Sequence, residues 1–248
     1  MIGVFDSGVG GLTVIKPLIE HFKSDIIYLG DTARVPYGNK SRETIIKYSI
    51  ENTRFLLKKG VDFIIVACNT ASSLAIEALR NTFNVPIFGV VESTAKVASN
   101  FSSIAVIGTK ATIESNAYKK TIKMFNRNAQ IEQRACPLFV PLIEEGLIND
   151  EITKIVAKRY LSGINAQTLV LGCTHYPLIK HVIQDILPNT NIIDSGTSLI
   201  HTIDKSMFKG SGKVEFYATD SPENFSKIGK FFLGKDFNSV KLVDLEEL

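Results

Sequence analysis

The stretches IVACNT, residues 65–70, and VLGCTH, residues 170–175, decide the fold of this chain. Each begins with a short apolar run, reaches a cysteine, and continues into polar residues of the kinds that begin helices. A buried strand that passes directly into a helix is typical of a parallel sheet covered by helices on both faces. The two stretches therefore predict two such strands, with Cys68 and Cys173 at the sheet edges where open α/β folds bind their ligands.

The same alternation of apolar runs and amphipathic stretches continues along the 248 residues. Buried strands are predicted at Ile2–Phe5, Ile26–Leu29, Phe63–Ala67, Val85–Val90, Ile104–Ile107, Thr168–Leu171 and Asn191–Asp194. Helices are predicted at Arg42–Lys59, Ala71–Phe83, Ile113–Phe125 and Glu151–Leu161. Another helix follows the first strand, where Pro17 predicts a late start or a kink. The expected fold class is α/β, with mostly parallel sheets flanked by helices.

A weak internal repeat predicts two similar α/β domains. Residues 4–6 align with 106–108, residues 65–68 with 170–173, and residues 86–88 with 191–193. The offsets are 102, 105 and 105 residues, in the same order along the chain. We expect a discontinuous first domain, a continuous second domain, and an active site in the cleft between them. The expected bounds are residues 1–92 with 203–248 for the first domain, in which 214–248 packs back onto the first part, and 93–202 for the second.

The composition argues against several classes of protein. With 45% hydrophobic and 21% charged residues, the chain is expected to be globular, with a sizeable core. The net charge of +3 is small and the basic residues are interspersed with acidic ones, so nucleic acid is not an expected partner. The longest stretch without charged side chains, Tyr160–Ile179, is too polar to span a membrane, and the N-terminal MIGVFD predicts a strand rather than a signal peptide. Three widely spaced cysteines form no disulfide framework, which predicts a cytoplasmic protein with free thiols.

Cys68 and Cys173 are the candidate catalytic residues. Beside the positive end of a helix, each thiol is expected to have a pKa below the free value of about 8.5. Two domains that face each other across a cleft would put the thiols on opposite sides of one ligand. One group can then remove a proton from a stereocentre while the other protonates the opposite face. The alternative is that both are small buried hydrophobes, and Cys136 is expected to be inert and to serve as a control.

Asp6 heads the glycine-rich loop DSGVGG, residues 6–11, after the first predicted strand. Its carboxylate suits recognition of a ligand ammonium group, or proton shuttling beside a thiol. The third glycine of a dinucleotide-binding loop is absent, and an acid there would repel a pyrophosphate. The alternative is a turn in which Asp6 caps the next helix.

Other polar residues follow predicted strands. Tyr37, in the turn of residues 31–38, can present a hydroxyl group or exposed backbone amides. His175 can orient the Cys173 thiol or share its proton, and it can equally be a helix cap. The hydroxyl groups that open the second domain's first helix can hold a carboxylate; they belong to Thr109, Thr112 and Ser115.

A zinc site is the metal alternative. Its candidate ligands are Cys68, Cys173, His175 and Asp6. The chain has neither a C-x-x-C motif nor a close pair of histidines, and these ligands are spread over separate strand ends. We therefore expect no metal site.

The chain resembles the glutamate racemases of the aspartate/glutamate racemase superfamily over nearly its whole length. The matching segments are GVFDSGVGGLTV from Gly3, YLGDTARVPYGNKS from Tyr28, IVACNTAS from Ile65, GVVES from Gly89, IGTKATIESNAY from Ile107, PLFVPLIEEG from Pro137 and LGCTHYPL from Leu171. The combination of ACNTAS and GCTHYPL at this separation is close to diagnostic. The segment after about residue 208 is less distinctive.

The resemblance implies a function for each matching residue. Cys68 and Cys173 are the implied proton donor and acceptor, assisted by Asp6 and His175. The implied substrate-binding residues are Ser7, Tyr37, Gly38, Asn69, Thr70 and Thr174, with Thr112 and Glu144 as further pocket members. With L-glutamate, the Cys173 thiolate would remove the α-proton and the Cys68 thiol would protonate the opposite face. The family makes D-glutamate for bacterial peptidoglycan, needs no cofactor and generally forms homodimers.

Three other functions remain open. The first is racemisation of aspartate or a related acid by the same superfamily. The second is a phosphotransferase, because residues 6–8 followed by Thr13 faintly resemble an actin-like ATPase loop, although no adenosine pocket motif is apparent. The third is a non-catalytic module that binds an amino acid.

Overall fold

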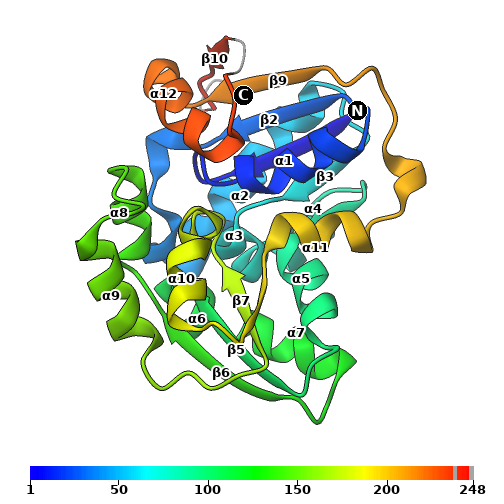
Figure 1. Cartoon of the computed structure of the whole chain (residues 1–248). Helices are drawn as coiled ribbons and strands as arrows, with labels where there is room; N and C mark the ends of the chain where they lie inside the picture. The colour runs from blue at the N-terminus through cyan, green and yellow to red at the C-terminus, as the bar shows by residue number, and fades with distance from the viewer. Residues whose placement is uncertain (237–238, 246–248) are drawn as a thin grey trace.

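The computed structural model describes residues 1–236 and 239–245, and the strands within them form two sheets. The first sheet has six described strands in the order β10-β9-β2-β1-β3-β4, and the second has four in the order β6-β5-β7-β8. Every pairing within these described strands is parallel, and helices flank both sheets (Figure 1). The predicted α/β class is confirmed. Of the predicted first domain, residues 237–238 and 246–248 lie outside the described residues.

The first lobe consists of the first sheet and the helices that cover it, at the top of Figure 1. Its strands are β1 (Ile2–Asp6), β2 (Ile26–Gly30), β3 (Phe63–Val66), β4 (Ile87–Gly89), β9 (Val214–Ala218) and β10 (Val240–Leu242). Its helices are α1 (Leu12–His21), α2 (Arg42–Lys58), α3 (Asn69–Leu74), α4 (Ile76–Thr82) and α12 (Pro222–Leu233), with 3-10 turns η1 (Thr32–Arg34) and η2 (Tyr37–Asn39).

The second lobe consists of the second sheet and its helices. Its strands are β5 (Ser103–Gly108), β6 (Gln130–Ala135), β7 (Thr168–Gly172) and β8 (Asn191–Ile193). Its helices are α6 (Lys110–Glu114), α7 (Ala117–Phe125), α8 (Phe139–Glu144), α9 (Glu151–Leu161) and α10 (Lys180–Ile186), with the 3-10 turn η3 (Tyr176–Ile179). The chain passes between the lobes through α5 (Val90–Ala98) and through α11 (Ser195–Thr202), which the 3-10 turn η4 (Lys205–Met207) follows. In the described part of the chain, no helix has the length and hydropathy needed to span a membrane.

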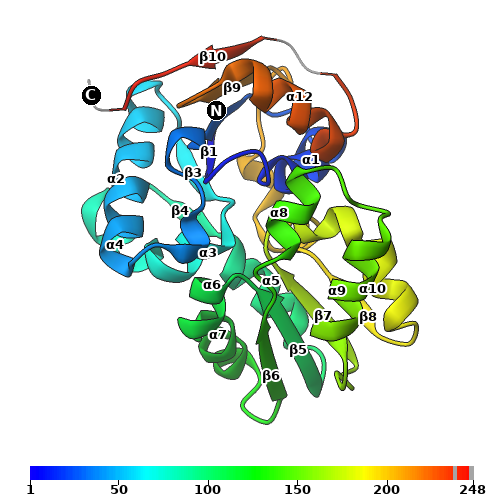
Figure 2. The same ribbon diagram turned by 90° about the vertical axis from the view of Figure 1, so that its left-hand side faces the viewer.

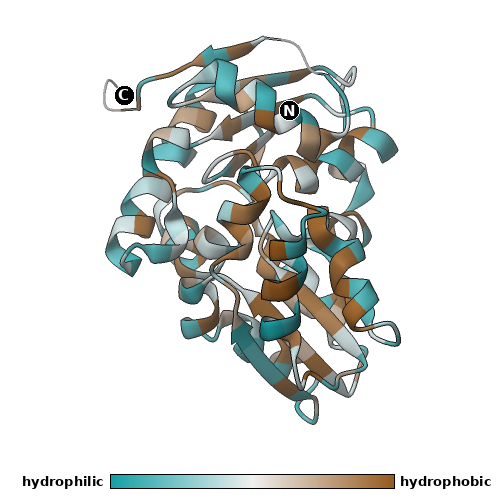
Figure 3. Ribbon diagram, turned by 60° about the vertical axis from the view of Figure 1, so that its left-hand side comes forward, coloured by the Kyte–Doolittle hydropathy of each residue, from teal (hydrophilic) through white to brown (hydrophobic). Residues whose placement is uncertain are grey.

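The first sheet is buried on both faces because apolar side chains occupy successive positions of its strands. Val4 packs with Leu12 of α1, while the next residue, Phe5, joins the cluster of Phe55 from α2 on the opposite face. Figure 2 shows α1 and α2 on the two sides of this sheet. In the second lobe the central strands β5 and β7 are also hydrophobic, whereas its helices alternate hydrophobic and hydrophilic residues (Figure 3). This pattern is typical of parallel sheets.

The strand registers repeat between the lobes. The order β1-β3-β4 in the first sheet corresponds to β5-β7-β8 in the second. The paired residues across these strands are Val4, Ile65 and Phe88 in the first lobe and Val106, Val170 and Ile193 in the second. These are the positions that the internal repeat aligns, so the two lobes share strand order and register.

Two predicted helices are each divided in the structure. The predicted helix 71–83 is α3 and α4, separated at Ala75, and the predicted helix 113–125 is α6 and α7, separated at Asn116 with a left-handed φ of 56°. Each first half begins earlier than predicted, because Cys68 and Thr109 take the N-cap positions. Hydrophobic periodicity continues across both breaks, so the pattern does not reveal them.

Some strands lack the apolar run used to predict the others. β6 has the polar sequence QIEQRA and lies at an edge of the second sheet, where one side of its backbone has no neighbouring strand among the described residues. β9 pairs with β2 and returns the end of the chain to the first sheet, and β10 pairs with β9.

Helix α1 begins at Leu12, ahead of Pro17, so the predicted late start is wrong. Because proline has no N–H, the Thr13 carbonyl four residues earlier loses its helical donor. Helix α11 packs against α1 at this point. A Cβ atom at Gly196 would lie 2.6 Å from the Thr13 carbonyl oxygen, so this close contact between the two helices requires glycine.

We expect Gly196→Ala to lower the free energy of unfolding by about 1–3 kcal/mol, because the clash is with backbone that cannot move aside. Urea unfolding followed by circular dichroism measures this change. His201→Ala, at an exposed position of the same helix, is the control and should change stability by less than about 0.5 kcal/mol. Equal unfolding curves for Gly196→Ala and the unmodified protein would contradict the packing described here.

Candidate active site

Cys68 and Cys173 line one cavity between the two lobes. Each follows a central strand, β3 in the first lobe and β7 in the second, at the carboxyl edge of its sheet. The cavity has a volume of about 420 Å³, within the range of roughly 300–1,000 Å³ that is usual for small-molecule sites. Two equivalent strands, one in each lobe, thus carry the two thiols that line a single cavity.

Most of the residues predicted for the site line this cavity. The lining residues among them are Ser7, Tyr37, Gly38, Cys68, Asn69, Thr70, Glu144, Cys173, Thr174 and His175. Among the residues that the structure describes, Asp6 and Thr112 lie behind the wall rather than on it. Asp6 contacts Thr174, and Thr112 contacts Thr70, so each is one hydrogen bond from the cavity.

Cys68 is the N-cap residue of α3 and is almost fully buried. Its Sγ lies 3.7 Å from the Ser7 hydroxyl oxygen. Burial, and then the negative charge of Asp6, raise the pKa of Cys68 to about 12, against a smaller opposing effect of the Ala71 and Ser7 amides. The predicted lowering by the helix is therefore wrong for this thiol, because desolvation outweighs a few backbone dipoles.

Asp6 is the last residue of β1 and is fully buried. Its Oδ1 accepts a hydrogen bond from the Gly8 amide at 2.9 Å, and its Oδ2 accepts one from the Thr174 hydroxyl at 3.3 Å. Burial raises the pKa of Asp6, while the charge of His175 lowers it less strongly. The Thr174 bond crosses between the lobes, so this carboxyl group links the surroundings of the two thiols.

Cys173, His175 and Glu144 form a chain of polar contacts in the second lobe. His175 Nδ1 lies 3.9 Å from Cys173 Sγ, and Nε2 lies 2.9 Å from Glu144 Oε1. Burial lowers the pKa of His175, but Cys173 and Glu144 together raise it to about 10. The imidazole is therefore protonated at neutral pH, which places a positively charged ring beside Cys173 Sγ.

The segment after Cys173 differs from the prediction. No α-helix begins at this thiol; a turn follows, and then the 3-10 turn η3 from Tyr176. Cys173 therefore lacks the helix N-terminus expected from its sequence context. Its electrostatic partner is the imidazolium of His175 instead.

Asn69 and a group of threonines join the lobes beside the cavity. The Thr70 hydroxyl lies 3.0 Å from that of Thr109, which in turn donates to Thr112 at 2.9 Å. Asn69 Oδ1 accepts hydrogen bonds from Tyr118 at 2.5 Å and from Ser195 at 3.4 Å. Its Nδ2 is buried with no hydrogen-bond acceptor among the described residues. A buried amide donor without a partner carries a desolvation cost that no hydrogen bond offsets.

Sequence reasoning did not assign the apolar part of the cavity wall. It comprises Val35, Pro137, Leu138, Val140 and Pro141. The segment PLFVP, residues 137–141, matched the family motif, but an apolar segment between prolines has no periodicity that separates a cavity wall from a core. Lys110, at the start of α6, also lines the cavity and carries a positive charge.

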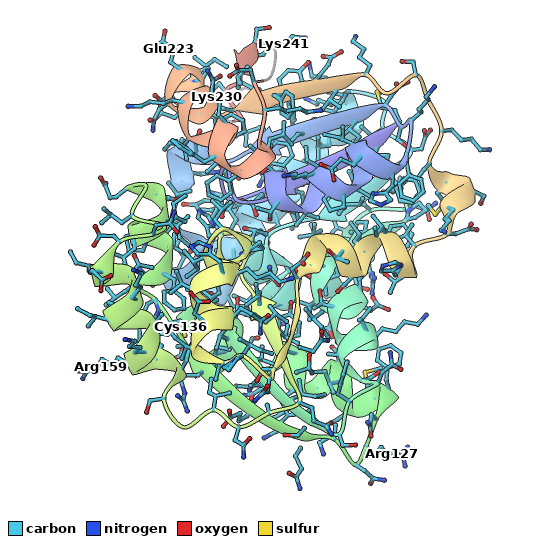
Figure 4. All side chains as sticks on the ribbon, in the orientation of Figure 1. Arg127, Cys136, Arg159, Glu223, Lys230 and Lys241 are labelled. Carbon is cyan, nitrogen blue, oxygen red and sulfur yellow. The ribbon has the colours of Figure 1, made fainter. Side chains whose placement is uncertain are left out.

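Cys136 has the properties expected of a control. It is fully buried after β6, in the second lobe (Figure 4), and its Sγ lies 3.8 Å from the Arg134 carbonyl oxygen. Burial raises its pKa to about 12. It is not among the described residues that line the cavity.

A second cavity of about 580 Å³ lies on another side of the molecule, between α4 and α7. Its charged lining residues include Arg42, Arg80 and Lys120 together with Glu77 and Glu92. Neither candidate thiol, Cys68 or Cys173, is among the described residues that line it; both line the smaller cavity. Nor do any three His, Cys, Asp or Glu side chains of the described residues converge as a metal site would require.

Comparison with known proteins identifies relatives over the whole chain. Residues 13–203 match the family model for Asp/Glu/Hydantoin racemase. The glutamate racemase of Aquifex aeolicus is 48% identical, over 95% of this chain and 94% of its own. A crystal structure of glutamate racemase from Francisella tularensis in complex with D-glutamate is 39% identical, with a TM-score of 0.92 over 100% of this chain and 98% of that one. An aspartate racemase of Picrophilus torridus, 18% identical with a TM-score of 0.58 over 84% of this chain and 95% of that one, shares the fold.

We expect the His175 imidazole to titrate near pH 10 and Glu144→Gln to lower its pKa part of the way, because the change removes one of the two partners that raise this pKa while Cys173 remains. NMR titration of the ring resonances measures both values, with exposed His21 as the internal reference. Since the folded pKa is raised, protonation stabilises the fold fully below pH 6.5, and this contribution is lost as the pH rises through about 10. A ring that titrates near 6.5 in the unmodified protein would contradict the imidazolium assignment.

Proposed function

This chain belongs to the Asp/Glu/Hydantoin racemase family, and from that membership we propose that it interconverts L- and D-glutamate by proton transfer between Cys68 and Cys173. One observation carries the proposal: both thiols line the same cavity from different lobes. Racemisation needs one group to remove the α-proton from one face and another to protonate the opposite face. Two thiols that exchange these functions serve both directions of the reaction.

The protonation of Cys68 and the charge of His175 support one order of events. A pKa of about 12 keeps Cys68 as a neutral thiol, ready to donate a proton. The His175 imidazolium lies beside Cys173, the group that accepts the α-proton of L-glutamate in this scheme. L-Glutamate is then deprotonated by Cys173 and protonated on the other face by Cys68. The product leaves the pair in the opposite state, with a Cys68 thiolate and a Cys173 thiol, which is the state that accepts D-glutamate.

The most demanding chemical step is removal of the α-proton, which is only weakly acidic because its carbon carries a carboxylate. Fixed donors in a cavity that excludes water stabilise the negative charge that develops on the carboxylate. The Thr70 hydroxyl, whose hydrogen bonds leave the donor open, and the Lys110 ammonium group are such donors on the cavity wall. Asp6 lies behind the wall with its hydrogen bond to Thr174, which favours assistance to the Cys68 thiol over direct binding of the ligand ammonium group.

Glutamate is the proposed substrate for two reasons. The most similar curated relatives carry the name glutamate racemase and cover almost all of this chain, whereas the aspartate racemase likeness extends only to the fold. The apolar segment of residues 137–141 also provides a wall for the side-chain methylenes of a five-carbon acid.

The cellular setting follows from the same family. We infer a cytoplasmic enzyme that supplies D-glutamate for peptidoglycan synthesis and forms a homodimer. These statements rest on the family resemblance, and sedimentation of the purified protein measures the assembly directly.

We expect Cys68→Ala and Cys173→Ala each to reduce racemisation of glutamate by at least about 10²-fold, because each removes one of the two proton carriers. Incubation with L-glutamate in heavy water, without added cofactor, separates the possibilities. Circular dichroism follows inversion and NMR follows α-deuteration; a binding module or a phosphotransferase would give neither. Cys136→Ala is the matched control and should retain nearly full activity. Near-normal turnover in either alanine variant of the catalytic pair would overturn the two-thiol mechanism.

We expect kcat/KM for glutamate to exceed that for aspartate by about 10–200-fold, because one methylene group that fills an apolar site contributes about that much discrimination. Initial rates with each L-acid, followed by circular dichroism, measure the ratio. Equal or higher turnover of aspartate would assign the chain to another substrate of the family while leaving the thiol chemistry intact.

A further inference from the structure

The loop Val35–Asn39 forms one side of the cavity, yet its largest side chain turns away from the ligand space. The Tyr37 side chain is 1% exposed, and its hydroxyl donates to Asp31 and accepts from Asn52 Nδ2 at 3.1 Å. The hydroxyl that the sequence offered as a substrate contact is therefore already satisfied inside the first lobe. The Tyr37 side chain therefore anchors the loop to the first lobe, and the position of the loop beside the cavity depends on this anchor.

Arg34 holds this loop from the inside. Its Nε lies 2.9 and 2.8 Å from the two carboxylate oxygens of Asp31, and its NH2 donates to Asn52 Oδ1 at 3.1 Å. Its NH1 pairs with Glu51, and the guanidinium lies 4.1 Å from the centre of the Tyr48 ring. Helix α2, which carries these last three residues, is thus bonded to the loop through one planar cation whose donors diverge in fixed directions.

Asp31 connects the same network to β1, the strand that ends at Asp6. Its backbone amide donates to the Asp6 carbonyl oxygen at 3.0 Å, and its Oδ1 accepts from the Thr219 hydroxyl at 3.0 Å. Asp31 itself is fully buried. The Asp31 carboxylate is therefore hydrogen-bonded to Thr219, which follows β9, and to Arg34 and Tyr37. These bonds tie its position to that of the loop.

The tip of the loop rests on the opposite lobe. A Cβ atom at Gly38 would lie 2.9 Å from Thr109 Cβ, so the loop backbone touches the residue that caps α6. Thr109 is hydrogen-bonded to Thr70 and Thr112 beside the cavity. Displacement of the loop would change the width of the cavity where the lobes meet.

We infer that Arg34 and Asn52 are positioning residues, which hold the Val35–Asn39 backbone at the distance from Thr109 at which the cavity fits its ligand. This inference deepens the proposed function and rests on it for the identity of the ligand. Neither side chain is among the described residues that line the cavity, so each acts through Tyr37 and Asp31.

Asn52→Leu is the principal test, because leucine of similar volume removes both hydrogen bonds and leaves the Tyr37 hydroxyl and Arg34 each short of one partner. We expect KM for L- and D-glutamate to rise roughly tenfold with kcat changed less than about twofold, since binding geometry is altered and the thiols are not. Arg34→Lys keeps the positive charge beside Asp31 but loses the diverging donors, and should give a smaller rise in KM in the same sense.

Asp25→Asn is the matched control. Asp25 Oδ1 accepts amides of residues 211–213 at the amino end of β2, far from the carboxyl edge that carries the cavity. It should lower the melting temperature and leave KM unchanged. A rise in KM in this variant equal to that in Asn52→Leu, at matched loss of stability, would show a general loosening of the fold and overturn the inference.

Hydrogen exchange provides a readout that does not depend on turnover. The Lys40 amide is bonded to the Tyr37 carbonyl at 3.1 Å, and exchange across residues 35–40 should be at least tenfold faster in Asn52→Leu than in the unmodified protein or in Asp25→Asn. Unchanged protection of this segment overturns the positioning inference even if the protein racemises glutamate. If the protein does not racemise glutamate, faster exchange confined to this segment still supports it, and only the proposed function fails.

Discussion

Burial of the two thiols is the constraint on which the site depends. Burial makes the Cys68 thiolate costly, and this cost outweighs the amides at the start of α3. Cys173 is buried to a similar degree but has the His175 imidazolium beside it, held in turn by Glu144. The surroundings of the two thiols therefore differ in charge, with Asp6 near Cys68 and His175 near Cys173, although both thiols follow equivalent strands. The proposed transfer of a proton from one face of a carbon to the other uses this difference.

The equivalence of β3 and β7 explains how two cysteines far apart in the sequence come to line one cavity. Parallel strands end at the same edge of a sheet. A residue that directly follows β3 or β7 therefore lies at the carboxyl edge, where α/β folds bind their ligands. The shared register places Cys68 and Cys173 at equivalent strand ends, and the packing of the lobes brings both to one cavity. The loops that follow the other strands then complete the cavity: residues 6–8 after β1, and the segment held by Arg34 after β2.

The sequence predicted the features that depend on neighbouring residues alone. The apolar runs that end in Cys68 and Cys173, and the repeat that relates them, can be recognised in the sequence without knowledge of which strands pair. The breaks at Ala75 and Asn116 were not predictable, because the hydrophobic periodicity continues through both of them.

The shift in the pKa of Cys68 was predicted in the wrong direction, because the burial of this thiol depends on how the lobes assemble. The residues behind the wall and the apolar segment 137–141 likewise acquire their functions only when two distant parts of the chain meet. Family resemblance supplied Glu144, which no pattern in its own sequence context distinguishes.

The two crossings between the lobes, α5 and α11, lie next to each other, and the hydroxyl groups of Thr94 and Ser195 are 3.4 Å apart at their junction. The lobes also contact each other beside the cavity, through the Thr70–Thr109 and Thr174–Asp6 hydrogen bonds. The Gly196 contact with α1 lies at the crossings, whereas Gly38 and Thr109 meet at the cavity. Because the cavity is farther from the crossings than Gly196 is, any rotation of the lobes about the crossings would displace the Gly38–Thr109 contact more than the Gly196 contact.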